Sequence, residues 1–212
     1  MSATEAPAVG VTLPDLPLFP LQMVLFPGAK LGLKVFEARY LDLMSRCLRS
    51  GEPFAVVCIH QGSEVQHPGE APPRFESLGT LARLDELDAE QPGILRVQCQ
   101  GTRRVQLGAP RQQADGLWRA DATPLADDPV LPIPAAMTAC ALALGQAIQA
   151  LAAQDQRPFL PPFQLDQAGW VANRWCELLP LPLAAKQQLM ALADPLARLQ
   201  LVDEFLRSKQ VI

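Results

Sequence analysis

Cys58 and His60 are the best candidates in the sequence for a pair that could carry out covalent catalysis. They lie two positions apart in an apolar segment, so both side chains could face one side of a strand as a nucleophile and its base. We favour a buried cysteine followed by a surface histidine, because free cysteines are usually buried. His60 could also join Glu64, His67 and Glu70 around a metal, but their spacing matches no closed site. We predict no catalytic residue, no metal and no cofactor.

A first candidate for peptide binding is a short charged and aromatic cluster. Glu37, Arg39 and Tyr40 follow one another closely at the predicted start of a helix. The competing interpretation is structural: Glu37 lies near the positive end of the helix dipole, Arg39 faces solvent and Tyr40 continues a core stripe. We favour the structural interpretation and keep peptide contact as the alternative.

A second candidate for peptide binding is apolar and lies in a proline-rich stretch. Its members are Phe19, Met23, Leu25 and Phe26. Because prolines disfavour a regular central strand, some of these side chains could stay open as a patch for apolar peptide segments. The competing interpretation, which we favour, is that all four fill the core.

The composition is that of an ordinary globular protein, and its charge argues against some partners. Hydrophobic residues make up 49% of the chain, and the net charge is −4. Residues 13–125 hold 12 basic and 13 acidic side chains, and residues 126–212 hold 6 and 8. This balance favours neither nucleic acid nor an anionic membrane as partner, although Arg103 and Arg104 could form a local basic patch.

The number and spacing of the cysteines, together with the apolar tracts, indicate the cellular compartment. The 5 cysteines are odd in number and widely separated, which predicts free thiols in a reducing, cytoplasmic setting. Residues 1–12 lack the basic start and apolar run of a signal peptide, so we expect a flexible tail. Residues 130–153 are apolar but interrupted by proline and glycine, so we expect a buried helix and no membrane span.

Residues 13–125 carry the pattern of short strands. Residues 54–59 are a continuous apolar run typical of a buried strand, and residues 95–100 alternate as a strand with one wet face does. Gly101 interrupts that alternation, so we expect a hairpin or a bulge there. Residues 118–122 predict a further strand.

Helices are expected both inside and after this β-rich half. The first ends at Gly51 and carries an apolar stripe formed by Phe36, Tyr40, Leu43, Met44 and Cys47. Prolines after residue 123 mark a boundary, and residues 126–212 predict a bundle of about four helices. Asp166 and Asp194 are the expected N-caps of two of them.

Three linked motifs resemble a known family. They are LPLFPL at residues 16–21, VLFPG at residues 24–28 and VFEARY at residues 35–40. Together they resemble the start of the amino-terminal, substrate-binding domain of Lon proteases. Matches further along are GTLAR at 79–83, WVAN at 170–173 and DPLARL at 194–199, so the resemblance spans residues 13–208.

The resemblance implies an α+β fold: a β-rich, PUA-like pseudo-barrel with one inserted helix in residues 13–125, then a helical bundle in residues 126–212. In Lon proteases this region recognises unfolded or tagged substrate, and the ATPase and peptidase follow it. The chain contains no glycine-rich lysine motif for nucleotide phosphates and no segment resembling the Lon Ser and Lys peptidase site.

We therefore expect a stand-alone, non-enzymatic module that binds exposed apolar or unfolded polypeptide, or a protein partner such as a separate protease or chaperone. Two alternatives stay open. One is an RNA-binding module, because PUA-like barrels include RNA binders. The other is a small hydrolase that uses Cys58 and His60, which would require a depressed cysteine pKa.

Overall fold

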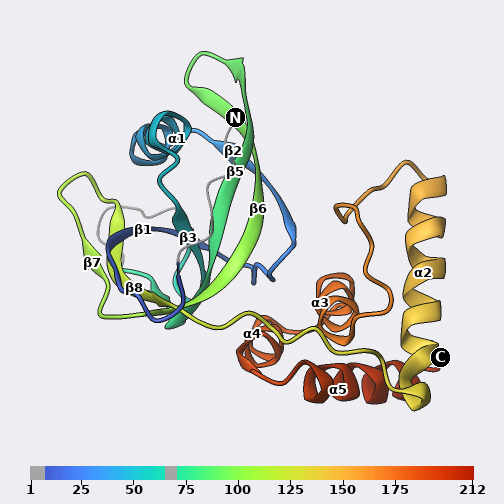
Figure 1. Cartoon of the computed structure of the whole chain (residues 1–212). Helices are drawn as coiled ribbons and strands as arrows, with labels where there is room; N and C mark the ends of the chain where they lie inside the picture. The colour runs from blue at the N-terminus through green and yellow to red at the C-terminus, as the bar shows by residue number, and fades with distance from the viewer. Residues whose placement is uncertain (1–7, 65–70) are drawn as a thin grey trace. The chain divides into compact units, whose positions relative to one another are not determined.

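The chain forms two compact units, residues 1–127 and residues 128–212. The structure, a computed structural model, describes residues 8–64 and 71–212. The first unit is rich in strands and the second is all helical (Figure 1). The predicted α+β fold is confirmed.

The described residues of the first unit, 8–64 and 71–127, form eight strands and one helix. In chain order these are β1 (Leu13–Leu21), β2 (Lys30–Val35), α1 (Ala38–Ser50), β3 (Phe54–Gln61), β4 (Arg74–Phe75), β5 (Leu78–Gln91), β6 (Ile94–Leu107), β7 (Arg111–Gln112) and β8 (Trp118–Pro124).

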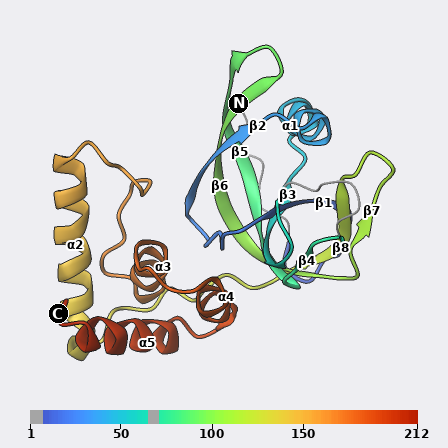
Figure 2. The same cartoon turned by 180° about the vertical axis from the view of Figure 1, so that it is seen from behind.

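Five of these strands close into a barrel. The hydrogen-bonded order β6-β5-β3-β1-β8 returns to its start because β8 also pairs with the end of β6, between Val105 and Pro124. The pairs are antiparallel except β1 with β3. Closure removes the open edges of these five strands. The strand β2 continues the sheet beyond β6, and Figure 2 shows β4 beside β3 from behind.

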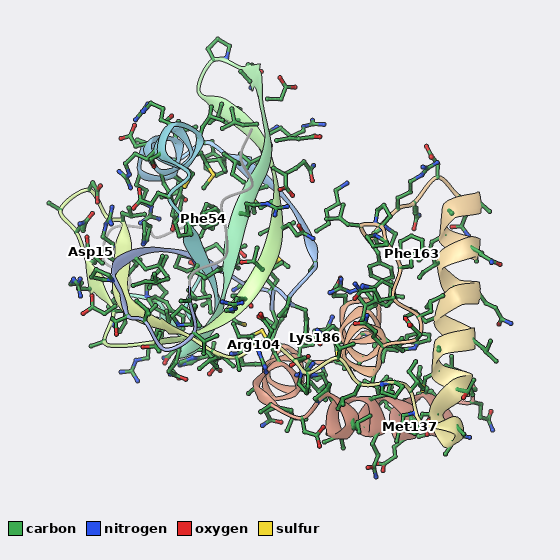
Figure 3. The ribbon with its side chains drawn as sticks, viewed as in Figure 1. Asp15, Phe54, Arg104, Met137, Phe163 and Lys186 are labelled. Carbon is green, nitrogen blue, oxygen red and sulfur yellow. The ribbon has the colours of Figure 1, made fainter. Side chains whose placement is uncertain are left out.

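Strand β3 has two buried faces, which explains its unbroken apolar run. Ala55 and Val57 point into the barrel interior, and alternation turns Phe54 and Val56 to the other side of the sheet. Phe54 is fully buried and lies close to the ring of Phe19 (Figure 3). The interior cluster is formed by Leu16, Leu18, Ala55, Val57, Leu81, Val105, Leu107, Ala120 and Ala122.

Gly101 marks a bulge and does not end its strand. β6 runs through it without a turn, while the register with β5 shifts between the pairs Ala82–Gly101 and Thr80–Arg104. A Cβ at Gly101 would lie 2.6 Å from the carbonyl oxygen of Phe26, so no larger residue fits. Of the two predicted possibilities, the bulge is confirmed.

The helix α1 begins later than its apolar pattern suggested. Glu37 is the N-cap residue, and Tyr40, Leu43 and Met44 are buried as predicted. Phe36 lies before the cap and is 56% exposed, so its assignment to the core stripe was wrong. Helical periodicity does not apply to a residue outside the helix.

The second unit consists of four helices and one short 3-10 turn. These are η1 (Ala135–Met137), α2 (Thr138–Ala153), α3 (Ala168–Leu178), α4 (Leu183–Ala191) and α5 (Pro195–Ser208). Asp194 caps α5 as predicted, since its Oδ1 accepts the Leu196 N–H at 2.9 Å. Asp166 caps no helix: α3 has Gln167 at its N-cap, without a side-chain capping bond.

The apolar helix α2 is buried less than its sequence predicted. Cys140 and Leu144 are its buried residues, whereas Leu142 is 65% exposed. The 19 residues Ala135–Ala153 are long and apolar enough, by length and composition alone, to cross a membrane, and 17% of the window is buried. The prediction of a buried helix is therefore wrong for most of its surface within this unit.

Two buried arginines hold the helices together. Arg198 is 1% exposed and bonds with Asp128, Asn173 and the carbonyl oxygens of Leu189 and Leu192. Its donors thus neutralise a carboxylate and satisfy carbonyl groups where α4 ends.

The second buried arginine, Arg174, is also 1% exposed. Its Nη2 lies 2.5 Å from Glu177 Oε1. Its guanidinium carbon lies 5.6 Å from the ring centroids of both Phe159 and Trp170. The guanidinium is therefore surrounded by the carboxyl group of Glu177 and by two aromatic rings.

Candidate functional site

The predicted peptide-binding residues divide by burial. Four are in the core, with exposed fractions of 6% or less: Phe19, Leu25, Phe26 and Tyr40. Met23, Glu37 and Arg39 are partly exposed. Burial favours a core role for the first four, and their contact with peptide stays a prediction.

Four of the seven residues form one continuous set of contacts at the start of α1. The ring of Phe19 stacks on Tyr40 at 4.2 Å between centroids, and the Arg39 guanidinium carbon lies 4.7 Å from the Tyr40 ring centroid. Arg39 also pairs with Glu37 at 2.7 Å and donates from Nη1 to the Gly116 carbonyl at 2.8 Å. Burial raises the pKa of Tyr40 to about 12, so its hydroxyl stays protonated.

The sequence predicted that Arg39 faces solvent, and this prediction was wrong. Its side chain is 10% exposed, because it joins α1 to the turn before β8. An arginine stem buries apolar surface while its head keeps fixed partners. The cluster therefore anchors the start of the helix, and its accessible part is Glu37.

Leu25 and Phe26 lie outside this cluster, in the segment of the chain that packs against β5 and β6. Thr80 Oγ1 donates to the Leu25 carbonyl at 2.6 Å, and the side chain of Leu25 packs against Gly101. Gly28 has a φ of 78° and donates its N–H to the Gly101 carbonyl at 2.8 Å. The tertiary fold thus separates two groups that are neighbours in the sequence.

The exposed apolar surface next to α1 was missed by the sequence analysis. Phe36 follows the last residue of β2, where Val35 pairs with Leu95. Register puts Leu33 and Leu95 on the same face as the buried Val97, yet both remain partly exposed. Leu87, which pairs with Val97 from β5, lies on that face too and is also partly exposed. We call these three leucines together with Phe36, which directly follows β2 in the chain, the β2 rim, defined as Leu33, Phe36, Leu87 and Leu95. The signal was the position of Phe36 before the cap Glu37.

The arginines of the first unit are largely engaged by carboxylates. Arg103 bonds through two nitrogens to Asp127, and Arg104 is buried and donates to the Ala126 carbonyl. A phosphate backbone needs accessible cations. The predicted basic patch at Arg103 and Arg104 is therefore not an open one.

Cys58 lacks the electrostatics of a nucleophile. It is 4% exposed, and burial, followed by the charge of Glu76, raises its thiol pKa to about 11. His60 is exposed, and its Nδ1 lies 3.8 Å from Glu76 Oε1. A nucleophilic cysteine needs a lowered pKa, so this geometry disfavours the hydrolase alternative.

The residues considered for metal binding are not gathered together where the structure describes them. His67 and Glu70 lie outside the described residues, and Glu64 Oε1 accepts the Gln22 N–H at 2.5 Å. Within residues 8–64 and 71–212, no three His, Cys, Asp or Glu side chains are grouped as metal ligands.

Comparisons with known proteins agree with this architecture. Residues 15–208 match the family model of the ATP-dependent protease La (LON) substrate-binding domain. A crystal structure of a Lon N-terminal domain protein from Xanthomonas campestris is 32% identical, with a TM-score of 0.72 over 90% of this chain and 97% of that one.

A more distant structure shares the fold. The N-terminal domain of the Mycobacterium avium complex Lon protease is 15% identical, with a TM-score of 0.61 over 90% of this chain and 96% of that one. Comparison with curated protein sequences finds no match. The family model and the Xanthomonas structure together show that this chain belongs to the Lon substrate-binding domain family.

Proposed function

We propose that the chain binds polypeptide segments that expose apolar side chains, in the cytoplasm, and that it does so without a catalytic step. Membership in a family of soluble substrate-binding domains supports polypeptide as the ligand class. The observation that carries the finer proposal is Phe36, an aromatic side chain that is 56% exposed directly after the end of β2, a strand that also carries the partly exposed Leu33. Unfolded chains present the apolar groups that such a surface would cover.

The β2 rim supplies apolar contact area, and its neighbours supply orientation. Glu37 directly follows Phe36, and its side chain keeps 28% exposure while it pairs with Arg39. A fixed carboxylate beside an aromatic anchor could accept N–H groups from a bound backbone. Of the residues predicted from the sequence, Glu37 and Arg39 are therefore the ones we carry into this proposal.

The experiment compares one client in two states. Carboxymethylated, permanently unfolded α-lactalbumin and the native form are each titrated against the chain by biolayer interferometry. We expect binding of the unfolded form alone. Phe36→Ser should weaken it roughly ten- to hundredfold, because covering an aromatic side chain contributes about 1.5–3 kcal/mol.

The matched control is Leu48→Ser, which removes a side chain 58% exposed on α1 outside the β2 rim. Its affinity should equal that of the unchanged chain. Equal binding of native and unfolded client, or equal losses in the two variants, would contradict the proposal.

A further inference from the structure

The strand β2 ends the sheet and has one open edge. It pairs with β6 from Lys30–Gln100 to Val35–Leu95, and the strand order finishes with it. Within the described part of the chain, no strand pairs with its other side. A strand edge of this kind presents backbone N–H and C=O groups that a further extended segment can use.

The register identifies which backbone groups point outward. The Ala29 carbonyl accepts the Gly101 N–H at 2.9 Å, so the carbonyl of Ala29 is directed toward β6. Direction alternates along an antiparallel strand, which turns Leu31 and Leu33 toward β6 as well. The N–H and C=O groups of Lys30 and Gly32 therefore point to the open edge.

The two faces of β2 differ in chemistry. Leu31, Leu33 and Val35 lie on the face shared with Leu87 and Leu95, whereas Lys30 and Lys34 lie on the opposite face and are exposed. A strand added to the edge would put alternate side chains next to these two faces. It would need apolar groups on one side and acidic groups on the other.

Charge argues against a second copy of β2 as the occupant. Two copies paired antiparallel about Gly32 would set Lys30 of each opposite Lys34 of the other. Like charges directly opposite destabilise strand pairing, and edge lysines are a known protection against self-association.

We propose that the open edge of β2 takes an extended polypeptide segment of alternating apolar and acidic residues by adding it as a strand to the sheet. This inference rests on the proposed function and specifies how the client is held. Main-chain hydrogen bonds to Lys30 and Gly32 would give affinity that tolerates sequence, and the lysines would select charge.

The test uses a short labelled peptide of alternating valine and glutamate, measured by fluorescence anisotropy. Gly32→Pro removes the outward N–H, and we expect roughly tenfold weaker binding. Gly32→Ala is the matched control, because its Cβ would meet only the side chain of Gln98, at 3.4 Å, and the N–H is kept. The same peptide methylated on alternate backbone nitrogens should not bind.

A second variant does not depend on the fold tolerating proline. Lys30→Glu combined with Lys34→Glu should reverse the preference, from the valine and glutamate peptide to one of valine and lysine. Unchanged preference, or equal binding of the methylated peptide, would overturn the edge proposal. A dimer that Gly32→Pro abolishes would assign the edge to a second copy and overturn it too.

The failure of this inference is distinguishable from failure of the proposed function. If unfolded α-lactalbumin still binds and is weakened by Phe36→Ser but not by Gly32→Pro, the edge inference is wrong and the proposed function stands. If unfolded and native forms bind alike, the proposed function itself is wrong.

Discussion

The two units of the chain satisfy their buried polar groups in different ways. In the first unit, strand ladders pair the backbone and leave an apolar barrel interior, formed around residues such as Val57 and Val105. In the second unit, side chains pair the backbone carbonyls at helix ends. Arg198 donates to the carbonyls of Leu189 and Leu192, and Lys186 Nζ donates to the carbonyl of Glu177. Short helices leave more unpaired backbone groups per residue than a closed sheet does.

The two units are therefore sensitive to different kinds of substitution. The barrel depends on close backbone approach, which glycine permits, and the bundle depends on buried charge, above all on Arg198, which bonds with Asp128 and Asn173. Removing one member of a buried charged network leaves the others desolvated and unpaired. Substitutions in the two units should therefore act by different mechanisms.

The largest effect is expected for Arg198→Leu. It leaves Asp128 and Asn173 without their buried partner, and we expect a loss of about 3–5 kcal/mol in unfolding free energy. Urea denaturation measures the loss, and hydrogen exchange should place it in residues 128–212. Arg207→Leu is the control, because that side chain is 51% exposed and should matter far less. Equal losses of unfolding free energy in both variants would show that the buried arginine matters no more to the helical unit than an exposed one.

Gly101→Ala should give the next largest effect, in the barrel. The new Cβ would lie 2.6 Å from the Phe26 carbonyl oxygen, so the chain must shift, at a cost of about 1–3 kcal/mol. Gly32→Ala on the neighbouring strand provides the control and should be nearly neutral. Thermal unfolding followed by circular dichroism distinguishes them. A tolerated alanine at 101 would show that close approach does not limit the barrel.

The buried pair in the second unit predicts a pH dependence. Burial raises the pKa of Glu177 from 4.5 to about 7, so the folded chain keeps a proton that the unfolded chain releases. The unfolding free energy should therefore fall as pH rises from 4.5 to 7. Because the side chain keeps 18% exposure, we expect a smaller change than for Arg198→Leu. Glu177→Gln should flatten this part of the profile, and an unchanged slope would exclude Glu177 as its source.

The smallest effect is expected at Asp15, on the outer side of the barrel (Figure 3). Its φ is 53°, and its carboxylate accepts from Arg111 at 2.7 Å. Asp15→Ala loses the ion pair and suits this conformation poorly, so we expect a loss of about 1 kcal/mol. Asp15→Gly separates the contribution of the ion pair from that of the backbone, since glycine adopts a positive φ without strain. If glycine and alanine lose the same unfolding free energy, the whole effect belongs to the ion pair.

Local patterns were sufficient for strands in which one face, or both, is buried along most of the length. The alternation of residues 95–100 and the apolar run of 54–59 correspond to β6 and β3, and Asp194 before Pro195 caps α5. The family motifs were equally readable, because their prolines and Gly28 fix the local path of the chain.

The candidate site was less predictable, because exposure is not a local property. Phe36 and Tyr40 are both aromatic and four residues apart, yet one is exposed and the other stacks on Phe19. The Arg39 side chain is largely buried because it donates a hydrogen bond to the carbonyl of Gly116, 77 residues away in sequence. No spacing rule within the segment encodes that contact.

The family, the β-rich and helical halves, and a charge balance that disfavours nucleic acid could all be read from the sequence, since they follow from residue types and short-range geometry. The three-dimensional fold was needed to show that four of the seven candidate residues are buried, that α2 stays largely uncovered within its unit, and that β2 has an open edge among the described residues. The physical reason is that burial and strand pairing are settled by segments distant in sequence, which a local pattern does not contain.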